Sequence, residues 1–148
     1  MSAPSAPVGV WEQPPALREF RDAGVLDASD VHLATTLARL AGEPDPQVVL
    51  AAALAARAPR HGHVAVDLAT VRDRAAVDLA DVAHLLDGLA WPEPDGWLDA
   101  VVRSPLVAPT DGTDPPIVVH AGLVYLERYR TYEHVVARHL LRRAELAR

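Results

Sequence analysis

The sequence predicts a mostly helical α+β fold: a helical bundle, a small antiparallel hairpin sheet in a winged-helix-like arrangement, and a C-terminal helix. Apolar residues recur every three to four positions through most of residues 16–103, as in amphipathic helices. Two β-branched apolar runs flank Ala121-Gly122 within residues 117–126, which is typical of a tight hairpin. The 148 residues, half of them apolar, suit one domain with a substantial core.

The N-terminal half is predicted to be an arm followed by three helices. Residues 1–15 are rich in Pro and Ala and lack periodicity, so we expect a flexible arm ahead of one domain, 16–148. Helices are predicted at 16–23, 29–41 and 47–58 from their caps and apolar spacing. The last of these is apolar on nearly every face, which predicts a buried central helix.

The second half is predicted to mix short helices and strands. A strand at 63–67 and a helical turn at 69–74 precede a helix over 79–89, for which Asp78 is the expected N-cap. A short helix at 95–103 and a brief strand at 106–107 lead to the hairpin. Thr131 then begins a final helix with one apolar face: Tyr132, Val136, Leu140 and Ala144.

Two missing residue types exclude several chemistries. The sequence contains no cysteine, so it holds no disulfide, thiolate nucleophile, Cys-ligated zinc or iron–sulfur cluster. All 14 basic residues are arginine, so a Schiff-base lysine and the lysine of a P-loop are absent. Neither a signal peptide nor a membrane-spanning stretch is predicted, which favours a cytoplasmic protein.

Charge is divided unevenly along the chain. The net charge is −6, yet from Glu127 onward six arginines stand against three glutamates, a local +3. Residues 1–126 carry eight arginines and seventeen acids, a net −9. An acidic body argues against broad contact with nucleic-acid phosphates, while the basic end is either an interaction surface or a solvated helix face.

No motif predicts a catalytic, cofactor or metal site. His61 and His63 share one face of an extended segment, with Asp67 as a possible third metal ligand. Histidines in turns are far more often structural, and no second histidine cluster accompanies this pair. Ser104 and Thr110 lack the Gly-x-Ser-x-Gly turn of a serine hydrolase.

Four segments carry a family resemblance across residues 16–146. They are LREFRDAGVLDASDVHLATTLARLAGEPDPQVVLAAALAARA, GHVAVDL, LAWPEPDGWLDAVVRSPLV and PPIVVHAGLVYLERYRTYEHVVARHL. In this order they resemble the N-terminal domain of RecD, the alpha subunit of exodeoxyribonuclease V (the RecBCD helicase–nuclease), in an Ala/Arg-rich actinobacterial form. The matching motifs are structural rather than catalytic.

The resemblance implies a part of a larger DNA-repair machine. RecD-like subunits are ATP-dependent 5′→3′ helicases of double-strand-break repair, whose Walker A motif follows this domain. ATP and Mg²⁺ are therefore expected only for those later domains, and no catalytic residue is carried over. The domain itself is expected to dock onto another subunit of a RecBCD-type complex, with DNA bound through the complex and no membrane contact.

Two functions follow as hypotheses. A docking module predicts an exposed apolar patch with a basic rim, for which the candidates are Trp97, Tyr129, Tyr132, Arg138 and Arg142. The alternative is a winged-helix-type DNA-binding module that uses the hairpin and the basic last helix. That function predicts salt-sensitive DNA binding that depends on Arg128, Arg130 or Arg138.

Overall fold

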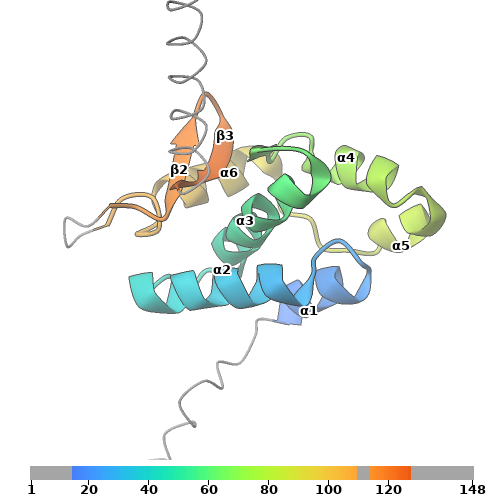
Figure 1. The fold of residues 1–148 in the computed structure, drawn as a ribbon, viewed down its shortest axis with the longest axis horizontal. Coiled ribbons are helices and arrows are strands. Elements are labelled where there is room, and N and C mark those ends of the chain that lie inside the picture. The colour runs from blue at the N-terminus through green and yellow to red at the C-terminus, as the bar shows by residue number, and fades with distance from the viewer. Residues whose placement is uncertain (1–14, 110–113, 128–148) are drawn as a thin grey trace, which may run out of the picture.

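One buried helix, α3 (Pro46–Arg57), organises the fold in the computed structural model of this chain, which describes residues 15–109 and 114–127. Two helices precede α3: α1 (Pro15–Asp22) and α2 (Ala28–Ala41). The elements after it are η1 (Ala58–His61), β1 (Ala65–Asp67), α4 (Val71–Asp78), η2 (Ala80–Val82), α5 (Ala83–Leu86), α6 (Pro94–Val102), β2 (Ile117–His120) and β3 (Leu123–Leu126). Figure 1 shows α2 passing below α3 in this view and the β2–β3 hairpin above them.

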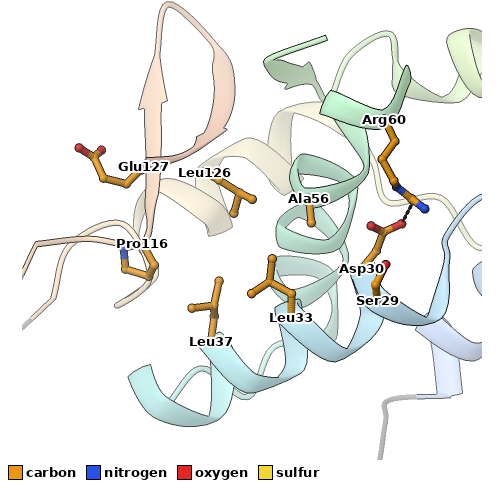
Figure 2. A pocket seen from close by; sticks show the side chains of 9 residues that line it. All are labelled: Ser29, Asp30, Leu33, Leu37, Ala56, Arg60, Pro116, Leu126 and Glu127. Atoms are coloured by element: carbon orange, nitrogen blue, oxygen red, sulfur yellow. Dashed lines mark hydrogen bonds and ion pairs between the residues drawn. The ribbon is translucent and has the colours of Figure 1, made fainter. Parts of the chain in front are cut away.

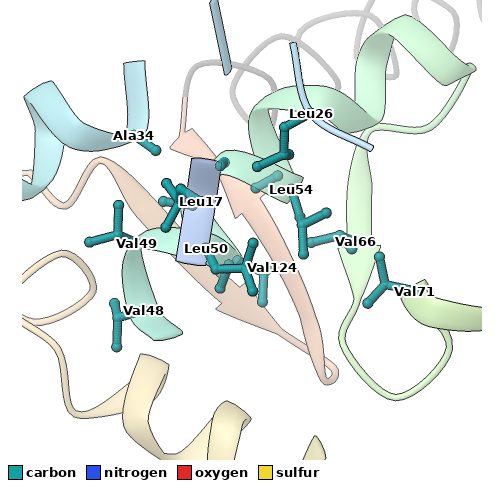
Figure 3. Close-up of a cluster of buried hydrophobic side chains, with 14 of the residues drawn as sticks. Leu17, Leu26, Ala34, Val48, Val49, Leu50, Leu54, Val66, Val71 and Val124 are labelled. Carbon is teal, nitrogen blue, oxygen red and sulfur yellow. The ribbon is translucent and has the colours of Figure 1, made fainter. Parts of the chain in front are cut away.

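The sequence determines where α3 begins and why it is buried. The Asp45 side chain accepts a hydrogen bond from the Gln47 backbone N–H at 2.9 Å, and Pro46 occupies the first helical position. Every residue from Val48 to Ala55 is buried. Small alanines let neighbouring elements approach α3 from several sides, and Figure 3 shows side chains of α1, α2, β1, β3 and α4 gathered around it. The predicted buried central helix is confirmed.

The sheet joins distant parts of the chain. Its order is β1-β3-β2 with antiparallel pairing throughout, so the second hairpin strand is central. Ala121 (φ 52°) and Gly122 (φ 78°) both adopt left-handed backbone at the turn, as a two-residue hairpin of the I′ kind requires. The predicted hairpin and its turn are confirmed, and so is the mostly helical α+β class.

Two local predictions are wrong. The helix expected over 79–89 is broken: α4 ends at Asp78, and the chain continues as the short η2 and α5. Asp78 ends a helix instead of starting one: Leu79 (φ −118°, ψ 44°) leaves helical geometry, and the Asp78 carboxylate pairs with Arg57. The strand expected at 106–107 is a turn, in which only the Leu106 carbonyl meets the sheet, accepting from Ile117 N–H at 3.2 Å.

Candidate docking surface

An open apolar groove runs between α2, the end of α3 and the base of the hairpin. Its volume is about 400 Å³. Figure 2 shows Leu33 and Leu37 rising from α2 toward Leu126 of β3, with Ala56 of α3 behind them. Pro116 and Glu127 line the hairpin end of this α2 groove. Leu33 remains 39% exposed, so the groove presents aliphatic surface to solvent.

Charged side chains form the other end of the α2 groove. Arg60 of η1 donates to Asp27 at 2.9 Å and also to Asp30, and Asp30 accepts from the Asp27 backbone N–H at 2.9 Å. Burial raises the pKa of the Asp30 carboxyl, although the Asp27 N–H and Arg60 act against that rise. These contacts fix the start of α2 against η1.

A second ion pair joins α3 to α4. The Arg57 Nη2 atom lies 3.1 Å from the Asp78 carboxylate, and Arg57 is almost completely buried. Its Nε has no hydrogen-bond partner among the described residues. His61 Nδ1 lies 3.8 Å from the same carboxylate. Burial, then the nearby Arg57, lowers the pKa of His61 despite Asp78.

Residues 71–89, here called the α4–α5 lobe, hold a second group of exposed aliphatic side chains. Val77 is 77% exposed and Leu85 48% exposed, while Val71, Ala75 and Leu86 alone attach the lobe as fully buried residues. Four aspartates and two arginines give the lobe a net charge of −2. In Figure 1 the lobe extends on the side opposite the hairpin, so it offers an acidic, partly apolar surface.

Trp97 was wrongly predicted as part of an exposed patch. It is 1% exposed and fills the core between α6 and α3, where its indole N–H donates to the Gln47 carbonyl at 2.7 Å. The physical reason is that this carbonyl, in the first turn of α3, satisfies the indole N–H inside the core. The other four candidates, Tyr129, Tyr132, Arg138 and Arg142, lie outside the described residues.

The residues weighed as metal ligands or nucleophiles have structural partners. His63 Nε2 lies 3.0 Å from Arg74 Nη1, and Asp67 accepts from the Ala69 N–H at 2.9 Å. Within 15–109 and 114–127, no three His, Asp or Glu side chains group closely enough to hold a metal ion. Ser104 is buried and donates to Glu43 at 2.8 Å, which ties the chain after α6 to the α2–α3 loop.

Sequence reasoning missed Leu33 and counted Leu37 in the apolar set of this helix, together with Val31, Ala34, Ala38 and Ala41, without predicting a groove. Leu33 and Leu37 are four residues apart, so they lie on one side of α2, and Leu33 extends the apolar face beyond the predicted set. A signal was present, because the apolar stripe of α2 is wider than contact with α3 alone requires. Leu40 continues the same side and is 76% exposed.

Comparison with known proteins agrees with the order of elements. Residues 22–125 match the family described as RecBCD enzyme subunit RecD, N-terminal domain. Proteins named RecBCD enzyme subunit RecD from two strains of Mycobacterium tuberculosis are 46% identical over 127 residues, 84% of this chain and 20% of theirs. The protein of the same name from Mycolicibacterium smegmatis is 44% identical over 114 residues, 77% of this chain and 18% of its own. The chain thus spans about a fifth of these relatives.

Proposed function

Because this chain belongs to the RecD N-terminal domain family, we propose that it is a non-catalytic module that docks onto another subunit of a RecBCD-type complex. The relatives' names place them as subunits of an enzyme complex, and this chain corresponds to about a fifth of such a subunit. We further propose that it acts in the cytoplasm, in double-strand-break repair, as part of an ATP-dependent 5′→3′ helicase. ATP and Mg²⁺ would then be bound by other parts of the subunit, since this sequence lacks the lysine of a P-loop.

The observation that best supports docking is the aliphatic surface of the α4–α5 lobe. The exposed side chains of Val77 and Leu85 do not stabilise the isolated domain. Burying both against a partner would remove their apolar area from water and so favour binding. Protein interfaces commonly have an apolar centre surrounded by a polar or charged rim, and the lobe combines exposed aliphatic side chains with aspartates in this way. The surrounding aspartates favour a partner surface with arginine or lysine at its rim.

The DNA-binding alternative has less support in the described residues. The hairpin from Ile117 to Leu126 contains no arginine, and the lobe carries a net negative charge. Phosphate contacts need clustered cations. Direct DNA binding would therefore depend on the arginines at 128–148, which lie outside the described residues.

Charge substitutions in the lobe test docking. In the full-length subunit co-expressed with its partner subunits, Val77→Asp with Leu85→Asp should reduce co-purification at least about tenfold, because two charges would have to be desolvated at the interface. Val102→Asp on α6 is the matched control, since Val102 is 46% exposed outside the lobe. Circular dichroism verifies folding of each variant.

Two results would contradict the proposal. Unchanged subunit capture by the double variant would remove the lobe as the docking surface. Salt-dependent DNA binding by the chain alone, weakened by Arg128→Gln or Arg130→Gln and unaffected by the lobe substitutions, would favour the DNA-binding module.

A further inference from the structure

We propose that the α2 groove is the docking site for this chain's own C-terminal segment, residues 131–144. The proposal is independent of docking by the α4–α5 lobe, because it concerns a different face. It commits to an intramolecular occupant whose apolar residues Tyr132, Val136 and Leu140 would lie against Leu37, Leu33 and Ala56.

The first argument is where the described chain ends. Glu127 lines the groove, and its backbone N–H donates to the Pro116 carbonyl at 2.9 Å, which fixes the chain at the hairpin end of the groove. Twenty-one residues follow. From Glu127 to Thr131 the chain makes four residue steps and can span at most about 14 Å, so this short tether keeps Thr131 within reach of the hairpin end of the groove. A tether this short gives the segment an effective concentration in the millimolar range or above.

The second argument is the match of length and pattern. In a helix, Tyr132 to Leu140 covers about 12 Å at 1.5 Å per residue. The groove follows α2 from Leu37 back to Ser29, eight residues, which is also about 12 Å. Tyr132, Val136 and Leu140 are four residues apart, so they would lie on one face of a helix. That face would contact the aliphatic side chains of Leu33, Leu37 and Ala56 shown in Figure 2.

The third argument is charge. The segment 131–144 carries three arginines and one glutamate, a net +2, whereas the charged residues that line the groove, Asp30, Glu127 and Arg60, sum to a net −1. At the far end of the groove, Asp27 stays well exposed although it pairs with Arg60. Arg142 and Arg143 would reach that end when Tyr132 lies near Leu37.

Cysteine cross-linking tests the proposal directly, because the natural chain has no cysteine. In the full chain, Leu33→Cys combined with Val136→Cys should form a disulfide within the monomer about tenfold faster than a control pair. The control is Val102→Cys with Val136→Cys, in which the first position is similarly exposed but lies on α6. A disulfide requires Cα atoms within about 7 Å, so rapid closure reports the predicted contact.

A second measurement uses limited trypsin digestion, which cuts this lysine-free chain only after arginine. Cleavage after Arg138 should be about tenfold faster in Leu33→Asp than in the natural chain, with the circular dichroism spectrum unchanged, because cleavage follows the population of the open segment.

Equal cross-linking rates for both pairs would overturn the proposal. Disulfides only between two molecules would assign the groove to a second copy. If the thiol introduced by Leu33→Cys became unreactive only when partner subunits were added, the groove would be an interface with those subunits and the proposal would be wrong.

Discussion

Helix α3 and the α4–α5 lobe represent two ways of using aliphatic residues in one small domain. In α3, eight consecutive residues are buried, and the side chains are mostly alanine and valine so that several elements can pack closely. In the nineteen residues of the lobe, only Val71, Ala75 and Leu86 are fully buried, Ala76, Leu79 and Leu89 pack partly buried against the core, and Val77 and Leu85 are exposed to solvent. The difference shows that apolar content alone does not identify a core. Helix α3 is packed on all sides and stabilises the fold, whereas the lobe leaves apolar surface exposed that a partner could bind.

Of the substitutions that compare these two regions, Trp97→Ala should lower the free energy of unfolding most. It removes a fully buried indole next to α3 and its hydrogen bond to Gln47, so the free energy of unfolding should fall by about 3–5 kcal/mol. Val77→Ala in the lobe should change it by less than about 0.5 kcal/mol. Urea denaturation of both variants measures the difference. Comparable losses would mean that the lobe is as tightly packed as the centre.

Ala53→Leu should also distinguish the two regions. Ala53 is completely buried in α3, and a larger side chain would push neighbouring elements apart, costing about 1–3 kcal/mol. The same substitution at Ala80, which is exposed in η2, should be nearly neutral. Thermal unfolding followed by circular dichroism is the measurement. A tolerated leucine at position 53 would show that α3 has free space beside it.

Asp78→Ala tests the link between the two regions. It would leave the buried Arg57 guanidinium without its carboxylate, and we expect a loss of about 1–3 kcal/mol in the free energy of unfolding. Asp87→Ala is the control, because Asp87 lies 3.8 Å from Arg72 in an exposed pair and should matter by less than about 0.5 kcal/mol. If the two variants proved equally stable, the Arg57–Asp78 pair would be no stronger than a surface contact.

His61 should give the smallest effect, visible as pH dependence. Its pKa is lowered in the folded chain, so the unfolded chain binds the proton more readily. The folded state is therefore favoured above the ordinary histidine pKa of about 6.5, and that contribution is lost as the pH falls below it. His61→Gln should flatten the fall in stability between about pH 7 and pH 5. An unchanged slope in urea titrations at several pH values would contradict this assignment.

The sequence was informative wherever a local rule decides the structure. The Asp45-Pro46 start of α3 and the Ala121-Gly122 turn are local, and both were predicted correctly. The errors involve partners far along the chain. Trp97 finds its acceptor at Gln47, fifty positions earlier, and Asp78 finds Arg57 twenty-one positions earlier. The α2 groove was missed for the same reason, since Leu126 reaches Leu33 only through the tertiary fold.

The position of β3 in the sheet has a consequence for synthesis of the chain. Ala65 of β1 pairs with Tyr125 of β3, sixty residues later, and Val124 covers α3 beside Leu50 and Leu54. At about 5–20 residues per second, a ribosome needs about 3–12 seconds to make the intervening chain. During that interval β1 lacks its partner strand and one side of the alanine-rich helix has no sheet to cover it. The nascent chain is therefore most dependent on protection from aggregation after α3 has emerged and before the hairpin is complete.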